Sequence, residues 1–271
     1  PISSDHLDFI IYKGMERKVL GAIVEYLFQE KRWDFCLLTN IPTDSLTGRL
    51  LKEIMRNRSF QSEISQVCPY IPLPDHIEKF YTSLSKNRRN TIKRRRRNLQ
   101  KNYNGFEIVT CQNPDDIDDA MERLFKLHQK KWMEMKHKGN FARDKVRDFH
   151  KKVAGVFLNT NMLRLYFLRV QGKDVAALYT FKYNNKVFYY QGGWDPEWSK
   201  DRVGSILTNL VIENAINNGY SEYDFLRGTE DYKTRLTDKK RDEMDIFILN
   251  SFNSRIYLFI RNLYHNMQSQ R

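Results

Sequence analysis

The chain has 271 residues, which is enough for one large domain or two compact ones. Hydrophobic residues make up 41% of it and aromatic residues 13%, so it is too apolar to be disordered, and no apolar run approaches the roughly 20 residues that cross a bilayer. The net charge of +13 suggests a polyanionic partner such as nucleic acid or acidic lipid. Cys36, Cys68 and Cys111 are widely spaced and show no metal-binding pattern, so we expect reduced thiols, no metal and a cytoplasmic location.

The first 73 residues alternate between strand-like and helix-like segments. Residues 7–12 and 33–40 have the apolar character of strands, and residues 15–29 and 46–56 carry apolar side chains at the spacing of helices with one buried face. Extended structure returns at residues 67–73. This order predicts a parallel or mixed sheet with helices packed on it.

A strongly basic helix is expected at residues 79–101. Between Lys86 and Lys101 there are nine basic residues and no acidic one, and the apolar stripe is thin. Such a face is either solvated or binds the phosphates of a cofactor, a nucleotide-linked substrate, RNA or a membrane surface. The residues alone leave these alternatives open.

The next part of the chain predicts two amphipathic helices and then the clearest β region. His128 lies on the buried face of the first helix, at residues 113–136, and His150 lies beside the buried face of the second, at residues 144–158. The β runs are 163–170, 175–183 and 186–192. Short polar turns join them, which predicts two successive hairpins.

A helix at residues 204–218 leads into the stretch from Gly219 to Arg235. That stretch joins a short apolar strand to a cluster of ionisable residues, and a crossover can place its strand parallel to the previous one. Asp224 and Arg227 bracket two apolar residues. Because burying charge is costly unless it is paired, these two residues either satisfy structural partners or act on a ligand.

Several motifs occur in the order typical of one transferase family. They are P-Y-I-P-L-P (69–74), S-L-S-K-N-R-R-N-T-I-K-R (83–94), L-H-Q-K-K-W (127–132), F-H (149–150), V-A-A-L (175–178), G-G-W-D-P (192–196), V-G-S-I-L (203–207) and D-F-L-R-G-x-E-x-Y-K (224–233). On these motifs and the order of its elements, the chain resembles the CelD/BcsL family of GNAT-like acetyltransferases, relatives of the FemAB type. The last motif is the most specific of them.

The resemblance implies an α/β fold of the α+β kind, a GNAT-like mixed, mostly antiparallel, twisted sheet flanked by helices. It also implies tandem GNAT-like halves. We expect an incomplete amino-terminal half at residues 1–73 and an acyltransferase domain at residues 74–271 that carries the basic helix 79–101. The chain begins without Met and almost directly in an expected strand, in agreement with an incomplete first half.

The resemblance further implies an acyltransferase that moves an acetyl or similar group from acyl-CoA, used as a co-substrate, to an amine or hydroxyl. The expected acceptor is a small molecule or a saccharide, such as a sugar or a cell-envelope polysaccharide precursor. FemAB-type relatives use aminoacyl-tRNA as donor, so a tRNA-dependent transferase is an alternative, and a non-catalytic module that binds RNA or acidic polymer is another. Peripheral contact with an acidic membrane surface is also compatible with the charge.

Acyl transfer from a thioester needs a base, a donor to the carbonyl oxygen and an acid for the leaving thiolate. The expected catalytic residues are Asp224, Glu230, His150, Tyr232, Lys233 and Arg227, with Asp224, Glu230 or His150 as the base and Tyr232 or Tyr223 as the acid. The residues expected to contact CoA are Arg202, Val203, Gly204, Ser205 and Ala177. Those expected to contact the acceptor are Arg89, Trp132, Trp194 and Asp195.

Overall fold

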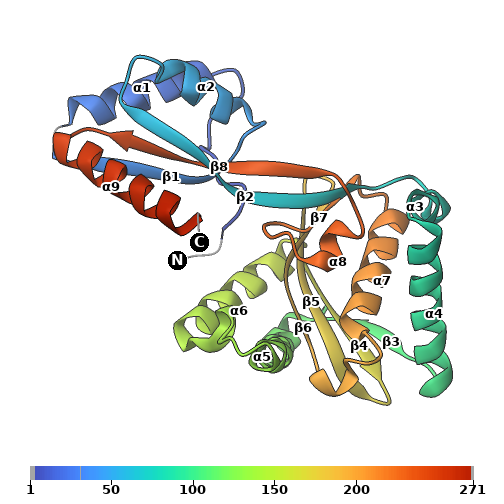
Figure 1. The fold of residues 1–271 in the computed structure, drawn as a ribbon. Helices are drawn as coiled ribbons and strands as arrows, with labels where there is room; N and C mark the ends of the chain where they lie inside the picture. The colour runs from blue at the N-terminus through green and yellow to red at the C-terminus, as the bar shows by residue number, and fades with distance from the viewer. Residues whose placement is uncertain (1–3, 31, 270–271) are drawn as a thin grey trace. The chain divides into compact units, whose positions relative to one another are not determined.

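The computed structural model describes residues 4–30 and 32–269. The chain folds into two compact units. Unit 1 consists of the described residues of 1–68 and 240–271, and unit 2 consists of residues 69–239. Figure 1 shows the path of the chain through both.

Unit 1 is a small sheet with helices. Its elements are α1 (Glu16–Gln29), β1 (Phe35–Pro42), α2 (Leu46–Ile54), the first part of β2 (Phe60–Pro72), β8 (Lys240–Leu249) and α9 (Phe252–Ser269). The strands β1 and β8 are antiparallel, with Phe35 opposite Leu249. Along β8, Met244, Ile246 and Ile248 alternate toward the core, where they pack against buried residues of α1 and α2.

Two sequence-based expectations need correction in this unit. We expected the second half to run from 74 to 271, but residues 240–269 belong to unit 1 because β8 pairs with β1 and its apolar face completes that core. Residues 7–12 were expected to form a strand but have no regular secondary structure. Ile10 and Tyr12 are among the exposed large apolar side chains, so this apolar run does not form a buried strand.

Unit 2 holds a sheet with helices on both faces. Its elements are the end of β2, α3 (Ile77–Ser83), α4 (Lys86–Asn102), β3 (Glu107–Thr110), η1 (Pro114–Asp116), α5 (Ile117–Glu134), η2 (Asn140–Ala142), α6 (Asp144–Asn159), β4 (Leu163–Val170), β5 (Lys173–Tyr183), β6 (Lys186–Trp194), η3 (Pro196–Trp198), α7 (Val203–Asn217), β7 (Glu222–Asp224) and α8 (Asp231–Thr234). The strand order is β2-β7-β6-β5-β4-β3. Neighbouring strands are antiparallel except β6 and β7, which are parallel as the crossover predicts.

The strands β4, β5 and β7 of unit 2 are buried on both faces. In β4, Leu165 and Phe167 pack with α5 and α6, whereas Tyr166 and Leu168 pack with the core that contains α3, α4 and α7. Successive side chains of a strand point to opposite faces, so this alternation places the two groups of helices on opposite sides of the sheet (Figure 1). The mixed, mostly antiparallel sheet flanked by helices is therefore confirmed.

The basic segment forms two helices, α3 and α4, and not the single helix expected at 79–101. The chain leaves the helical conformation at Leu84, and Ser85 begins α4 by accepting a hydrogen bond from the Arg88 N–H at 3.3 Å. Ile92 and Leu99 are buried and attach α4 to α7. The remaining faces of α4 carry its arginines and lysines.

Candidate active site

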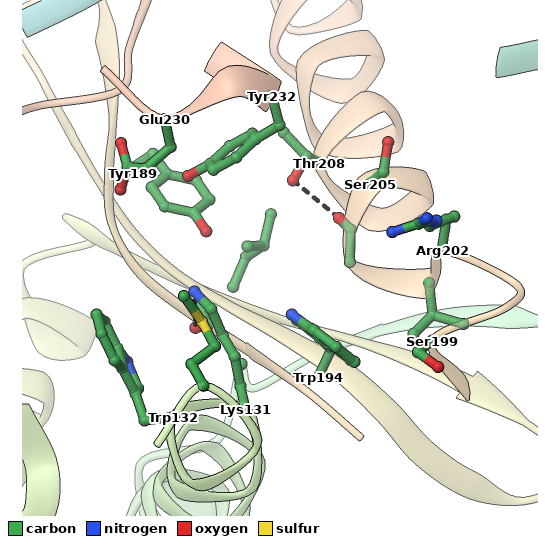
Figure 2. Close-up of a pocket in the computed structure, with 16 residues that line it drawn as sticks. Lys131, Trp132, Tyr189, Trp194, Ser199, Arg202, Ser205, Thr208, Glu230 and Tyr232 are labelled. Atoms are coloured by element: carbon green, nitrogen blue, oxygen red, sulfur yellow. Dashed lines mark hydrogen bonds between the residues drawn. The ribbon is translucent and has the colours of Figure 1, made fainter. Parts of the chain in front are cut away.

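The pocket of interest in unit 2 begins where the sheet opens between β6 and β7. These two strands pair only from Lys186 to Phe188 on β6, opposite Glu222 to Asp224 on β7. Beyond Phe188, β6 continues to Trp194 while pairing only with β5. A pocket of about 360 Å³ lies along this part of β6 (Figure 2).

The pocket is lined by residues of α5, β5, β6, α7 and α8 and of adjoining loops. Its lining residues are Lys131, Trp132, Met135, Leu178, Tyr189, Gly192, Gly193, Trp194, Ser199, Arg202, Val203, Gly204, Ser205, Thr208, Glu230 and Tyr232. Most of this lining is apolar, and the polar groups are gathered near its two ends. Such a composition is typical of a small-molecule site that orients its ligand through a few polar contacts.

One end of the pocket is the start of helix α7. Arg202 precedes the helix with a left-handed backbone (φ 58°), and no side chain caps the first turn. The N–H of Ile206 is the first in α7 to donate a hydrogen bond along the helix. It donates to the carbonyl of Arg202 at 3.1 Å. The preceding N–H groups and the positive end of the helix dipole are therefore available to an anion.

Gly204 allows Trp194 to pack against this first turn. A β-carbon at position 204 would stand 3.2 Å from Cδ1 of the Trp194 indole, which is tighter than ordinary packing. Thr208 donates its hydroxyl to the Gly204 carbonyl at 2.9 Å, so this hydroxyl is engaged within the helix (Figure 2). The indole thus forms one wall of the pocket directly beside the free N–H groups.

A second pocket of about 420 Å³ adjoins this helix start and is rich in arginine. It is lined by Arg88, Arg95, Arg202, Ser205, Glu230, Asp231, Tyr232 and Arg235. Four of these residues line the first pocket as well, so the two pockets share a wall. Four guanidinium groups face two carboxylates here, which leaves a net positive site.

The arginines of the second pocket are held close together. Burial lowers the pKa of Arg88 and of Arg95, and neighbouring arginines lower both further. Arg95 donates to the Ser205 hydroxyl at 3.4 Å, and the buried Nε of Arg88 has no hydrogen-bond partner. Like charges in this arrangement favour binding of an anion with several negative charges, such as a phosphate ester or diphosphate.

The other end of the first pocket is formed by Tyr189, Tyr232 and Glu230. The ring centroids of Tyr189 and Tyr232 lie 6.3 Å apart, and burial raises the pKa of Tyr189 to about 12 and that of Tyr232 well above its ordinary value. Both phenols are therefore protonated at neutral pH. Glu230 is exposed and pairs with Lys233 at 2.9 Å.

Lys131 and Trp132 enter the pocket from α5. Burial is the main cause that lowers the pKa of Lys131, and its Nζ lies 3.5 Å from the Gly192 carbonyl of β6. Trp132 donates its indole N–H to Nε2 of His128 at 2.8 Å, and His128 is fully buried. This hydrogen bond holds the Trp132 ring at the pocket wall.

The structure brings eight of the expected site residues to the first pocket. They are Glu230, Tyr232, Arg202, Val203, Gly204, Ser205, Trp132 and Trp194. These residues come from α5, β6, α7, α8 and adjoining loops, so their meeting depends on the fold and not on sequence proximity. Their individual roles stay predictions.

The remaining expected catalytic residues lie outside the lining of both pockets. Asp224 is fully buried in β7 and accepts the Leu226 N–H at 2.7 Å, which supports the left-handed backbone of Leu226 (φ 55°). Lys233 is 3% exposed and donates to the Arg227 carbonyl at 2.6 Å, so it braces the loop that carries Glu230. The geometry favours structural roles for Asp224 and Lys233.

His150 lies in an aromatic cluster away from the pocket. It is 6% exposed, its ring packs near Phe141, Phe149 and Tyr179, and its Nε2 lies 3.3 Å from the Tyr190 hydroxyl. Burial lowers its pKa to about 4, so it is neutral at physiological pH.

Three expected binding residues also lie outside the lining. Ala177 is fully buried in the core beneath α5 and α6. Asp195 forms an ion pair with Lys130 and accepts the Glu197 N–H at 3.3 Å, which caps η3. Arg89 is half-buried on α4.

The basic helix was expected either to be solvated or to bind phosphates, and the structure places two of its arginines, Arg88 and Arg95, in the second pocket. They are four residues before Ile92 and four before Leu99, so the helical spacing of the buried residues could have identified them as the inward-facing arginines of α4. Lys131 of the first pocket was not anticipated. The sequence did not indicate Lys131 as a pocket residue because the expected buried face of its helix contains His128 and Trp132. Its neighbour Trp132 was the available signal.

Among the described residues, one group of three side chains has the donor atoms and spacing for a metal ion. It consists of His6, Cys68 and Glu243 in unit 1, whose ligand atoms lie within 4.8 Å of one another. Glu243 already pairs with Nδ1 of His6 at 2.8 Å and accepts from Asn40 at 2.9 Å, and these contacts lower its pKa.

None of the helices described has the length and apolarity to span a membrane.

The fold and the site define a transferase of the GNAT type. Residues 86–234 match the family described as acetyltransferase (GNAT) domain, and the chain belongs to this family. The matched region runs from the start of α4 to the end of α8 and includes every residue that lines the first pocket. A search of curated proteins finds no match.

Solved structures resemble the chain over most of its length. FemX is 10% identical, with a TM-score of 0.63 over 94% of this chain and 82% of that chain. L-PGS from Bacillus licheniformis is 11% identical, with a TM-score of 0.59 over 92% and 78%. A conserved protein of unknown function from Bacteroides thetaiotaomicron is 16% identical, with a TM-score of 0.57 over 86% and 75%. At these identities the likeness shows the fold alone.

Proposed function

We propose that the protein transfers an acyl group from an acyl-CoA to an amine or hydroxyl of a sugar or cell-envelope polysaccharide precursor. The observation that carries this proposal is the continuity of the two pockets. The arginine-lined pocket suits the phosphates of a nucleotide carrier, and it shares a wall with the apolar pocket that holds Tyr232 and Glu230. A donor with phosphates at one end and a reactive acyl group at the other fits this arrangement.

The phosphate end is held by α7 and α4. Free N–H groups at the start of α7 and the guanidinium groups of Arg88, Arg95 and Arg202 would bind the diphosphate and the ribose phosphate of CoA. The apolar part of the first pocket, along Gly192 and Gly193 of β6, would take the pantetheine arm.

The chemistry is direct transfer to the acceptor. No cysteine or histidine occurs among the described residues that line the first pocket, so no imidazole of the lining is present to activate Ser199 or Ser205, and the Thr208 hydroxyl is engaged with a backbone carbonyl. An enzyme-bound acyl intermediate on such residues is therefore not favoured. Glu230 is the carboxylate of this lining and would accept the proton of the attacking amine or hydroxyl.

Tyr232 would supply a proton to the departing thiolate. Its pKa lies well above its ordinary value because it is buried, so it is protonated at neutral pH and can act as an acid. Trp132 and Trp194 present broad aromatic faces at the pocket, and such faces suit the apolar side of a sugar ring in the acceptor.

Binding measurements test the donor. Calorimetry with acetyl-CoA, a longer acyl-CoA, CoA and dephospho-CoA should show binding of the first three, with dephospho-CoA weaker by about tenfold because one phosphate contact is missing. Acetyl-CoA should also raise the melting temperature, as a ligand selective for the folded state does. Failure of every acyl-CoA to bind at millimolar concentration would contradict an acyl-CoA donor.

A second candidate donor is aminoacyl-tRNA, which the exposed side of α4 favours. Lys93, Arg94 and Arg97 are exposed on this helix and do not line either pocket, so a longer polyanion could extend along them. Filter binding of charged tRNA at increasing salt concentration tests this candidate. A steep salt dependence together with aminoacyl transfer to an acceptor would support it, whereas salt-dependent RNA binding without any transfer would indicate a non-catalytic binding module.

A further inference from the structure

Lys131 reaches into the first pocket without an ion-pair partner. In the described part of the chain, no carboxylate oxygen lies within 4.0 Å of its Nζ, in contrast to the neighbouring Lys130, which pairs with Asp195. The polar contact of its Nζ is the Gly192 carbonyl at 3.5 Å, and the ammonium also lies 5.4 Å from the centre of the Trp132 ring.

These contacts do not satisfy an ammonium group. An ammonium has three N–H donors, and the contact to Gly192 is at the long limit of a hydrogen bond. Burial lowers the pKa of Lys131 and outweighs the opposing effect of the Glu230 carboxylate, so a net cost of removing this charge from water remains. An oxygen of a bound ligand would reduce that cost by accepting a hydrogen bond from the ammonium.

The position of Lys131 is set by close backbone packing. A β-carbon on Gly193 would stand 2.6 Å from the α-carbon of His128, so α5 lies directly against β6 at this point. Figure 2 shows the Lys131 side chain rising from α5 into the pocket, with Tyr189 and Tyr232 reaching in from the other side. The ammonium therefore faces the end of the pocket where the proposed function places the acyl group.

We propose that the Lys131 ammonium donates a hydrogen bond to the carbonyl oxygen of the acyl group during transfer and stabilises the negative charge that forms there. The inference rests on the proposed function, but it applies equally to the thioester of an acyl-CoA and to the ester of an aminoacyl-tRNA. Lys131 is then a catalytic residue, because it touches a reacting atom.

Transfer proceeds by addition of the acceptor to the carbonyl carbon, followed by elimination of the thiolate. The lone pair of the acceptor forms a bond to the carbonyl carbon, and the carbonyl π pair moves to the oxygen beside Lys131. When the carbonyl re-forms, the bond to sulfur breaks and its electron pair leaves with sulfur. Glu230 takes the proton of the acceptor, Tyr232 gives its proton to the thiolate, and Lys131 keeps its own protons throughout.

The variants Lys131→Met and Lys131→Arg test the inference, with Lys126→Met as a control because Lys126 is exposed on the same helix. In steady-state assays with the donor that the wild type uses, Lys131→Met should lower kcat by about 100- to 1,000-fold. Its dissociation constant for the donor, from calorimetry, should stay within about threefold of the wild type. Lys131→Arg should recover part of kcat because the guanidinium remains a charged donor, and Lys126→Met should match the wild type.

The pH dependence of kcat distinguishes a role of Lys131 as a cation from a role as a base. The wild-type kcat should fall at alkaline pH as the ammonium loses its proton, and this fall should be absent in Lys131→Arg. A kcat that instead rises as Lys131 deprotonates would identify a neutral amine base and overturn the inference. A Lys131→Met kcat within about threefold of wild type, in a protein with an unchanged melting temperature, would overturn it too. Absence of transfer by the wild type from any acyl-CoA or aminoacyl-tRNA would overturn the proposed function and this inference together.

Discussion

Gly193 of β6 lies against the backbone of His128 in α5, and this contact fixes the separation of the strand and the helix that form one side of the pocket. A β-carbon at Gly193 would stand 2.6 Å from the α-carbon of His128. The obstruction is backbone, so rotation of a side chain cannot relieve it. Lys131 and Trp132 are three and four residues along the same helix, and their positions depend on this contact.

The substitution Gly193→Ala should therefore destabilise unit 2. Overpacking against a rigid backbone costs about 1–3 kcal/mol or more, which urea unfolding can measure. Gly155→Ala is the matched control. Gly155 lies in α6 with no atom near its missing β-carbon, so alanine should stabilise the protein by about 0.5–1 kcal/mol. Equal stability of Gly193→Ala and the wild type would show that α5 is not held in this way.

Loss of Arg88 or Arg95 should weaken donor binding. Each of the variants Arg88→Gln and Arg95→Gln removes a charged donor from the arginine-lined pocket, and a charge-assisted hydrogen bond contributes about 1.5–3 kcal/mol, or roughly tenfold or more in affinity. Calorimetry with acetyl-CoA measures the change. Arg97→Gln alters an exposed arginine of the same helix outside both pockets and should leave the affinity unchanged. A loss of the same size in all three variants would indicate general electrostatic attraction.

Tyr232→Phe should lower kcat and leave donor affinity nearly intact. Removing the hydroxyl removes the proposed acid, whose contribution in general acid catalysis is typically about 100-fold or more. Steady-state kinetics and calorimetry give the two quantities separately. Tyr183→Phe, at an exposed position of β5, should behave as the wild type. A Tyr232→Phe enzyme with normal kcat would assign the acid role to another group.

The protein should become less stable as the pH falls below about 6.5. Burial lowers the pKa of His128 and of His150 from 6.5 to about 4, so the unfolded chain binds protons more readily than the folded one. Their neutral forms stabilise the fold fully above pH 6.5, and this contribution is lost progressively toward pH 4. Urea unfolding at several pH values should show the decline, and His150→Phe should make it less steep. An unchanged slope in His150→Phe would mean that this histidine is not buried neutral.

Local pattern predicted most elements of unit 2 well because its strands and helices are regular and separated by short polar turns. The three central strands were expected within a few residues of their observed limits, and the parallel placement of β7 followed from the crossover rule. Pairing between distant segments was not predictable in the same way. Phe35 lies opposite Leu249 in unit 1, and nothing in the residues near either one indicates this partner.

In the candidate site, too, local pattern predicted some residues correctly and could not predict others. The motif from Asp224 to Lys233 led to Glu230 and Tyr232, which line the pocket, but it also suggested Asp224, which supports a turn inside the sheet. A charged residue next to a buried strand has the same sequence signature whether it binds a ligand or a backbone N–H. In the sequence, only its position beside Trp132 separated Lys131 from its many neighbouring lysines, because its distinctive property is the surface that it faces.

Strand β6 pairs with β7 over three residues only. The rest of β6 therefore has an unpaired edge, although β6 lies in the middle of the sheet. The backbone of Gly192, Gly193 and Trp194 has β5 on one side and the pocket on the other. A ligand arm that carries its own amide groups, such as pantetheine, can pair with this edge as a short substitute strand. Donor binding should then slow hydrogen exchange in this segment of β6 more than in β4, so the substrate would complete the sheet that encloses it.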